Sequence, residues 1–392
     1  MKLPAQWSKV PLHQVAHVQT GLSKSQNRSG PSVLCPYLRV ANVQDGYLDL
    51  SAIKQIEVPA SQAERFSLCK GDVLLTEGSI WNGEIPDCVH QNHVFAVRVV
   101  DKSVLLPDFL ACEIQSSRAK NYFMSCAKQT TNLASINSRQ LKDLLVLVPP
   151  LAEQRAIINV NATWDAAIRR TEQLIVAKSK HLAQRRENFL GRSNSLSCGQ
   201  VDLGEVTNEL TARNGEMYGR EAIMAVTKQT GMRPMREETI AANIERYKRV
   251  PPNAFAYNPM RLNIGSIAMS RFDHKVLVSP DYVVFACDES RLIPAYLDHL
   301  RHCKAWRNHF ELAGNGSVRV RIYYNDLRSF RFQLPSIEVQ TRIVRLLDAA
   351  SDEIELLKQQ VTALQTQKRG LMQKLLTGQW RLPPLKGDHP HV

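Results

Sequence analysis

The sequence has no closely spaced cysteine pairs, no long apolar run and no recognisable secretory signal. Its eight cysteines are scattered among 392 residues without a C-x-x-C, which favours free thiols in a reducing compartment. No apolar run approaches the roughly 18 residues of a membrane helix, and the mean hydropathy is -0.27. The first residues lack the apolar core and cleavage site of a signal peptide. We therefore expect a cytoplasmic protein.

Motifs for nucleotides, cofactors and metals are also missing. There is no G-x-x-x-x-G-K-[ST] loop, and residues 314–316 lack the third glycine of a dinucleotide fingerprint. Residues 258–261 come nearest to the N/D-P-P-aromatic motif of adenine methyltransferases, but they lack the second proline and the aromatic residue. Histidines and cysteines gather at 88–93 and 299–309 without a second ligand pair at zinc spacing. We expect no catalytic residue, cofactor or metal in this chain.

Negative charge is in short supply. The chain has 50 lysines and arginines against 37 aspartates and glutamates, which gives a net charge of +13 and a pI near 9.4. This excess favours a polyanionic partner such as nucleic acid. It is spread along the chain rather than held in one basic tail, so the fold would have to assemble a DNA-binding surface.

The sequence repeats itself at an offset of about 187 residues. Landmarks recur in the same order: a short opening run, a Gly-Ser-Ile, a β-branched run typical of a buried strand, a proline at a helix start, and an apolar run ending in proline. The matching pairs are 10–15 and 201–206, 78–80 and 265–267, 93–99 and 281–287, 107–110 and 294–297, and 147–150 and 332–335. The repeat predicts two globular parts built on one plan.

A metal-dependent nuclease is disfavoured by the same repeat. Asp108 and Glu113 could hold Mg²⁺, but Gln115 stands where a lysine would be needed. Ala295 replaces Asp108 in the second copy. We therefore interpret residues 107–115 as an ordinary helix start.

Each copy is followed by a long predicted helix. Residues 151–190 contain no proline or glycine, and residues 336–377 contain one glycine. Such helices would be roughly 55–60 Å long and would need a partner along their length. Pairing with each other is the simplest arrangement, and packing of each on its own globular part is the alternative.

Apolar residues in these helices recur every 3.5 residues, the spacing of a coiled coil. In the first helix six of ten such positions are apolar, namely Ile157, Trp164, Ile168, Ile175, Leu182 and Phe189. In the second helix nine of ten are apolar, with Lys368 as the exception: Ile343, Leu347, Ala350, Ile354, Leu357, Val361, Leu364, Leu371 and Leu375.

The helix starts and ends resemble one known family. Residues 150–158 (PLAEQRAII) and 335–344 (PSIEVQTRIV) open the two helices, and residues 369–378 (RGLMQKLLTG) close the second. Residues 181–191 (HLAQRRENFLG) are a looser version of that ending. Together with the repeat, these segments resemble the specificity subunits of type I restriction-modification systems over essentially the whole chain.

The resemblance implies an α+β fold in which two target-recognition domains form a pseudo-twofold repeat and two long helices form an antiparallel coiled coil. The implied segments are domain 1 (1–150), the first helix (151–192), domain 2 (193–335), the second helix (336–378) and a C-terminal tail (379–392). Each domain would read one half of a split, asymmetric DNA target. Two methylation subunits would dock on the helices and bring restriction subunits with them. S-adenosylmethionine, ATP and Mg²⁺ would then belong to those partner subunits.

Candidate DNA contacts are loops rich in side chains that bond base edges or phosphates. In the first domain they are Lys24, Gln26, Asn27, Arg28, Lys128, Gln129, Thr130, Thr131 and Asn132. In the second they are Arg213, Asn214, Lys228, Gln229, Asn315, Ser317 and Arg319. A loop of this composition before the last strand is a feature that the resemblance implies near DNA.

Two other functions remain open from the sequence. A coiled-coil scaffold that binds only proteins would make the basic charge incidental. A stand-alone nuclease would cut DNA with Mg²⁺ alone. Binding to random duplexes and incubation with DNA and Mg²⁺ distinguish these from a specificity subunit.

Overall fold

The computed structural model describes residues 3–23, 31–44, 47–76, 79–126, 136–191, 199–312 and 321–383. The chain divides into two compact units: unit 1 comprises Met1–Arg170 and Gln360–Val392, and unit 2 comprises Thr171–Gln359. Both units take in parts of the two long helices, α6 (Leu151–Arg186) and α10 (Ile337–Leu376), which the predicted division treated as separate segments. Over the described residues, no helix has the length and apolar character needed to cross a membrane.

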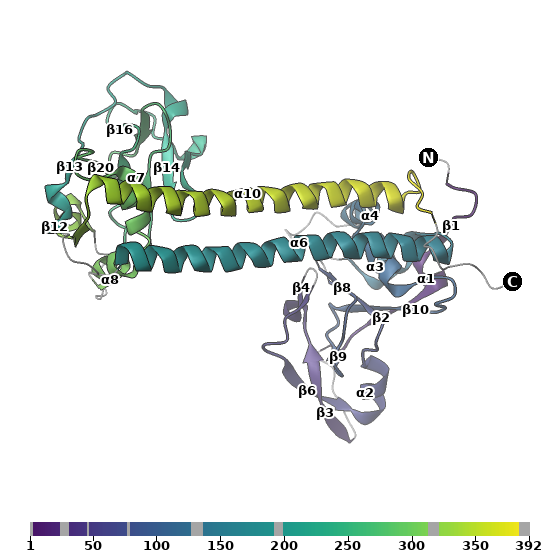
Figure 1. Cartoon of the computed structure of the whole chain (residues 1–392). Coiled ribbons are helices and arrows are strands. Elements are labelled where there is room, and N and C mark those ends of the chain that lie inside the picture. The colour runs from purple at the N-terminus through teal and green to yellow at the C-terminus, as the bar shows by residue number, and fades with distance from the viewer. Residues whose placement is uncertain are drawn as a thin grey trace. The chain divides into compact units, whose positions relative to one another are not determined.

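Unit 1 is built around a four-stranded antiparallel sheet with the order β2-β10-β7-β8. Figure 1 labels β2, β10 and β8 of this sheet. A β1-β11 pair, a β6-β3-β9 sheet and a β4-β5 pair complete its strands. The strands are β1 (Ser8–Pro11), β2 (Ala16–Thr20), β3 (Ser32–Leu38), β4 (Val43–Gln44), β5 (Tyr47–Leu48), β6 (Lys54–Pro59), β7 (Val73–Leu75), β8 (Ile80–Trp81), β9 (Val89–His90), β10 (Phe95–Val99) and β11 (Leu145–Val148). The helices are α1 (Leu12–Val15), α2 (Ala60–Phe66), α3 (Pro107–Gln115), α4 (Ser117–Cys126) and α5 (Ser138–Lys142).

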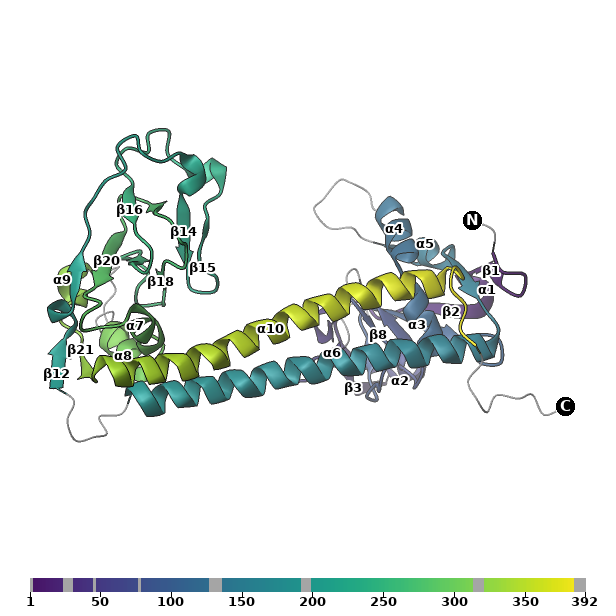
Figure 2. The same ribbon diagram turned by 45° about the horizontal axis from the view of Figure 1, so that its top comes forward.

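Unit 2 contains a second four-stranded antiparallel sheet with the order β13-β20-β17-β18. The pairs β12-β21, β14-β15 and β16-β19 accompany it, and Figure 2 shows the β14-β15 hairpin beside β18. The strands are β12 (Gly199–Asp202), β13 (Thr207–Glu209), β14 (Met224–Thr227), β15 (Gly231–Pro234), β16 (Lys248–Val250), β17 (Phe255–Tyr257), β18 (Ile267–Met269), β19 (Val276–Val278), β20 (Val283–Cys287) and β21 (Arg331–Leu334). The helices are α7 (Pro294–Leu300), α8 (Lys304–Leu312) and α9 (Tyr324–Leu327).

The two globular parts follow one plan, which confirms the predicted repeat and the α+β class. The strand order β2-β10-β7-β8 of unit 1 recurs as β13-β20-β17-β18 in unit 2, and the β1-β11 pair recurs as β12-β21. The predicted strand runs fall on β10 and β20, and the predicted helix starts fall on Pro107 of α3 and Pro294 of α7. Proline suits the first helical turn because its missing N–H would have no partner there.

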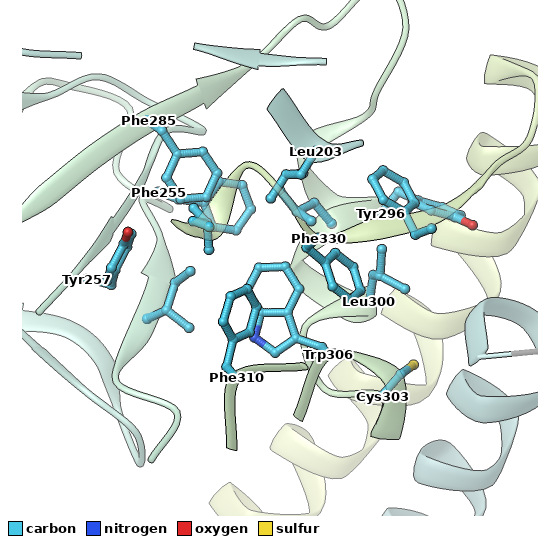
Figure 3. Packing of buried hydrophobic residues seen from close by; sticks show 14 of the residues in the cluster. Leu203, Phe255, Tyr257, Phe285, Tyr296, Leu300, Cys303, Trp306, Phe310 and Phe330 are labelled. Atoms are coloured by element: carbon cyan, nitrogen blue, oxygen red, sulfur yellow. The ribbon is translucent and has the colours of Figure 1, made fainter. Parts of the chain in front are cut away.

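The core of unit 2 is rich in aromatic side chains (Figure 3). Trp306 of α8 meets Phe330 at a ring-centroid distance of 4.9 Å, and Phe255 stacks on Phe285 at 5.1 Å. The core cluster of unit 1 consists mainly of aliphatic residues, together with Phe95 of β10 and Phe109 of α3. The shared plan therefore carries two different cores.

In unit 1 the beginning of α6 packs against the end of α10. Ile157, 1% exposed, shares a core cluster with Met372 and Leu375. Further along, the carboxylate of Asp165 pairs with the ammonium of Lys368 at 2.6 Å. Low residue numbers on one helix meet high numbers on the other, so the two stretches run antiparallel. The remaining heptad residues of this stretch are buried or half-buried: Trp164, Ile168, Val361, Leu364 and Leu371.

In unit 2 the end of α6 packs antiparallel to the beginning of α10. Lys178 pairs with Glu353 at 2.7 Å, and Leu182 and Leu347 lie in one core cluster. The other heptad residues here are buried or half-buried: Ile175, Ile343, Ala350, Ile354 and Leu357. Side-chain pairing between α6 and α10 thus follows the predicted 3.5-residue spacing in each unit.

Phe189 does not follow this spacing, and the interpretation of it as a coiled-coil residue was wrong. Its side chain is 44% exposed, whereas the next residue, Leu190, is 8% exposed and lies in the core of unit 2. The physical reason is a π-helical turn at Glu187–Gly191. A π turn adds a residue to the helical repeat and moves the following side chains around the axis.

Candidate nucleic-acid interface

Unit 1 has a polar cavity of about 660 Å³, which we call the unit 1 cleft. It lies where the end of β2 meets α2, α5 and the turn after β9. The lining residues are Val18, Gln19, Thr20, Gly21, Ser23, Gln62, Arg65, Phe66, Asn92, Ser138 and Lys142. Amide, hydroxyl and cationic groups thus dominate the lining.

The backbone at the end of β2 fixes one wall of the cleft. The amide of Leu22 donates to the carbonyl of His90 at 2.7 Å, and the amide of Asn92 donates to the carbonyl of Leu22 at 3.0 Å. A Cβ at position 21 would lie only 2.0 Å from the carbonyl oxygen of His90, so Gly21 is required for this close approach. These bonds hold the segment after β2 against the end of β9, where it forms part of the cleft wall.

Helix α2 supplies the opposite wall. Gln62 and Arg65 are three residues apart and therefore lie on one face of the helix. The side-chain amide of Gln19 on β2 donates to the carbonyl of Arg65 and links the two walls. The guanidinium of Arg65 lies 5.3 Å from the ring centre of Phe66 and is exposed. This cation is available to an anionic ligand.

Helix α5 closes the cleft with Ser138 and Lys142. The helix begins with a capping box in which the side chains of Asn137 and Gln140 each accept from the other's backbone amide, at 2.9 and 3.0 Å. Such a box fixes the first turn of a helix. Lys142 is exposed on the last turn. Two cations and several amides and hydroxyls therefore face one cavity, a set suited to phosphates and base edges.

Most of the predicted DNA-contact residues fall on segments that the structure does not describe. These are Lys24, Gln26, Asn27, Arg28, Lys128, Gln129, Thr130, Thr131, Asn132, Asn315, Ser317 and Arg319. The described chain nevertheless stops at Ser23 before the first of these loops and resumes at Ile136 after the second, and both Ser23 and nearby Ser138 line the unit 1 cleft. The flanks of two predicted loops thus meet at one cavity.

Four predicted residues of unit 2 are described. Lys228 and Gln229 are exposed at the turn of the β14-β15 hairpin, and Arg213 is exposed with one guanidinium nitrogen donating to the carbonyl of Arg246 at 2.7 Å. Asn214 is only 1% exposed, and both ends of its amide bond the backbone of Tyr218. The prediction for Asn214 was wrong, because this side chain holds its own loop together.

The counterpart of α5 in unit 2 presents a different surface. Helix α9 begins with Tyr324, and α5 begins with Ser138. The two starts are equivalent because the residue six positions later accepts a matching backbone bond in each unit. The amide of Leu12 donates to the carbonyl of Leu144, and the amide of Leu203 donates to the carbonyl of Phe330. The Tyr324 hydroxyl is buried and donates to the carbonyl of Thr207 on β13 at 2.7 Å. A structural tyrosine therefore replaces the cleft-lining serine.

His90 and His299, two of the residues that resembled metal ligands, have structural hydrogen-bond partners. In the part of the chain that the structure describes, no group of three or more His, Cys, Asp and Glu could hold a metal ion. His299 is buried between Asp348 and Arg186, at 2.9 and 3.2 Å, and burial raises the pKa of the Cys88 thiol to about 11. Asp108 of the rejected nuclease motif bonds the side-chain amide of Asn82 at 2.8 Å.

Sequence reasoning missed the cleft residues that come from α2 and from the turn after β9. Gln62, Arg65 and Asn92 are far apart in the sequence and belong to no motif, so only the fold brings them together. The available signal was the i, i+3 spacing of Gln62 and Arg65, which puts both side chains on one face if the segment is helical. That spacing alone also describes an ordinary solvated surface.

Comparison with known proteins finds similarity to specificity subunits of type I restriction-modification systems. Residues 4–176 match the type I restriction modification DNA specificity domain. A protein named as a type I restriction enzyme specificity subunit from Methanocaldococcus jannaschii is 22% identical over 97% of this chain and 95% of its own length. The EcoKI specificity subunit of Escherichia coli is 29% identical over 53% of this chain, and the match covers 44% of that relative.

Solved structures agree on the fold. A chain from a study of complex assembly and conformational transition of the type I R-M system has a TM-score of 0.62 and 18% identity, over 97% of this chain and all of that chain. The type I restriction-modification S subunit from M. genitalium has a TM-score of 0.53 and 12% identity, over 96% and 98% of the two chains. With its repeated sheet and paired long helices, the chain is similar over nearly its whole length to specificity subunits of type I restriction-modification systems, and residues 4–176 match the DNA specificity domain of that family.

Proposed function

We propose that this chain is a non-catalytic subunit that reads a split, asymmetric DNA target, one half with each globular part. The observation that carries the proposal is that the same strand order occurs in both units. The equivalent strands β2 and β13 end in different side chains. Two surfaces built on one plan are suited to two half-sites of unlike sequence. The unit 1 cleft is the proposed reading surface of the first part.

The chemistry of the cleft supports a division of labour within it. Arg65 and Lys142 are exposed cations of the type that hold phosphates, and such contacts set affinity and register without reading sequence. Gln62 and Asn92 carry amides, which can both donate to and accept from base edges. The reading of bases is therefore assigned to the amides.

We assign the pairing surface of α6 and α10 to setting the distance between the two half-sites. Half-sites read by linked modules commonly lie about one DNA turn apart, near 34 to 36 Å. Two methylation subunits would dock on these helices and bring restriction subunits into the complex. S-adenosylmethionine, ATP and Mg²⁺ would be bound by those partner subunits.

The test is selection from a pool of random duplexes by the full chain together with its methylation subunits. We expect enrichment of one split motif with a fixed spacer. A protein-only scaffold would enrich no motif, and a stand-alone nuclease would cut the pool when the chain alone is given Mg²⁺. Either result would overturn the proposal.

A further inference from the structure

Gln154, at the start of α6, is fully buried and makes three hydrogen bonds to backbone atoms. Its Oε1 accepts from the amide of Leu106 at 2.8 Å. Its Nε2 donates to the carbonyls of Val104 and Pro149, both at 2.8 Å. One side chain therefore joins the first turn of a long helix to the segment that leads into α3.

Gln340, at the start of α10, makes the same three bonds in unit 2. Its Oε1 accepts from the amide of Ile293 at 2.9 Å, and its Nε2 donates to the carbonyls of Arg291 and Pro335, both at 2.8 Å. It too is fully buried. The two glutamines are thus matched in burial, partners and geometry, and we call them the glutamine clamps.

The segments that the clamps hold are also built alike. In unit 1 the side chain of Asp101 accepts from the amide and hydroxyl of Ser103, at 2.8 and 2.7 Å. In unit 2 Asp288 accepts from the amide and hydroxyl of Ser290, at 3.1 and 2.6 Å. The turn that precedes each clamped segment is therefore held by the same pair of hydrogen bonds.

Each clamp acts directly on a core helix of its globular part. Leu106 and Ile293 are the N-cap residues of α3 and α7, whose following turns bury Phe109 and Tyr296 in the two cores. Figure 2 shows α3 beside the long-helix stretch of its own unit, and Figure 1 shows α7 beside that of unit 2. The clamp thereby ties the core of each globular part to its long helix.

The clamp bonds only backbone, so it is insensitive to the side chains around it. Val104 in unit 1 corresponds to Arg291 in unit 2, yet both carbonyls accept the same bond. Glutamine alone among residues of this size offers an acceptor and two donors together, since glutamate lacks the donors and methionine lacks both. The two globular parts can therefore differ in sequence and keep the same attachment.

We propose that Gln154 and Gln340 are positioning residues that fix the orientation of each globular part on its long helix and so restrict the DNA spacer length that the protein accepts. This inference rests on the proposed function. One added base pair moves a half-site by about 3.4 Å and turns it by about 35°. A rigid attachment would reject that displacement, and a loosened one would tolerate it.

The test uses the isosteric variants Gln154→Met and Gln340→Met in the full chain with its methylation subunits. Binding is measured to duplexes that carry the selected half-sites with the preferred spacer or with one base pair more or less. We expect the preference for the correct spacer to fall at least about tenfold in either variant, because three buried backbone groups lose their partner. The preferred bases of each half-site should not change.

Two controls separate positioning from general stability. Thr341→Val removes a helix-surface hydrogen bond next to the second clamp, and Val58→Ala truncates a separate small core of unit 1. Both should keep the wild-type spacer preference. Unchanged spacer preference in both methionine variants, or an equal loss in Val58→Ala, would overturn the inference.

Hydrogen exchange in the unmodified protein provides a test that does not depend on the variants folding. The amides of Leu106 and Ile293 should exchange only through global unfolding, and faster exchange would contradict a rigid clamp. If the wild-type complex selects no split motif at all, the proposed function fails. If it selects one motif with a sharp spacer that the variants preserve, only the clamp inference fails.

Discussion

Each globular part contains a four-stranded sheet of the same strand order, but the surroundings of the two sheets differ. In unit 1 the small Ser138 opens helix α5 and leaves a cleft lined by amides and cations. In unit 2 Tyr324 takes the equivalent place, and its hydroxyl is bonded to Thr207 inside an aromatic core. The comparison teaches that the repeated plan fixes the strands and their attachment to the long helices, while the residue at the equivalent helix start lines a cleft in unit 1 and bonds the core in unit 2.

The same comparison applies to the ends of the long helices. Helix α10 continues regularly to its end at Leu376, and Gly378 in the turn that follows has a φ of +70°, a conformation that glycine adopts easily. Helix α6 ends in a π turn that buries Leu190 and exposes Phe189. The predicted heptad fits the first ending and fails at the second.

The largest expected effect comes from breaking the π-turn packing. Leu190→Ala should lower the free energy of unfolding by about 2–5 kcal/mol, as truncation of a buried leucine does. Phe189→Ala should cost under about 1 kcal/mol, because its ring is largely solvated. Urea denaturation measures both. Equal losses of unfolding free energy in the two variants would indicate that the heptad continues through Phe189 and would contradict the π turn.

Removing a cation from the cleft should weaken DNA binding without changing the preferred bases of either half-site. Arg65→Ala should weaken DNA binding by roughly 10- to 100-fold and reduce the slope of log affinity against log salt by about one. Lys102→Ala, an exposed cation that does not line the cleft, is the matched control. Fluorescence anisotropy across a salt series provides the readout. A loss in Lys102→Ala as large as that in Arg65→Ala would remove the cleft from the interface.

Tyr324→Phe sharpens the contrast between the two helix starts. The variant keeps the ring and loses the hydroxyl bonded to Thr207, so unfolding should become easier by about 1–3 kcal/mol. We expect unaltered base preference in both half-sites, because the hydroxyl is buried in the core. Thermal unfolding and duplex selection measure the two quantities. A changed half-site motif would show that Tyr324 reaches DNA.

Acid should destabilise unit 2 more than unit 1. Burial, with help from Arg301, lowers the pKa of His302 to about 3, and burial also lowers the pKa of His299. In unit 1 burial lowers the pKa of His90. The unfolded chain therefore binds protons below about pH 6.5 that the folded chain does not, and stability falls as pH drops through this window.

The size of this effect is at most about 1.4 kcal/mol per histidine for each pH unit below 6.5. Urea unfolding at pH 7.5 and 5.5, with hydrogen exchange assigned to each unit, measures it. His302→Gln should reduce the pH dependence in unit 2. An unaltered stability at pH 5.5 would mean that these histidines are protonated in the folded protein.

The sequence predicts the features that leave a local signal and misses those that depend on tertiary packing. Prolines at helix starts, β-branched strands and the 3.5-residue spacing are local signals, and they located the repeat and the long helices. The π turn at Glu187–Gly191 depends on packing against unit 2 and leaves no local signal. Gln154 and Gln340 stood within the recognised helix starts, yet their role was hidden because their partners are backbone atoms up to about 50 residues away.

The sequence located only the loops that border the candidate site, and not the residues that form its walls. Polar loops around residues 24–28 and 128–132 were chosen by composition, and their described flanks do meet at the unit 1 cleft. The walls formed by Gln62, Arg65 and Asn92 required the tertiary fold. Asn214 was misjudged because composition does not show whether a polar side chain faces solvent or bonds its own loop.

The central claim is that two domains of the same fold read two half-sites of different sequence. Its most direct test is the motif that the assembled enzyme methylates on genomic DNA. We predict a split, asymmetric motif with one fixed spacer. We further expect that Gln62→Ala, which removes an amide assigned to base reading, degrades one half of it and leaves the other half intact. A continuous motif, a palindrome, or loss of both halves together in that variant would contradict the account.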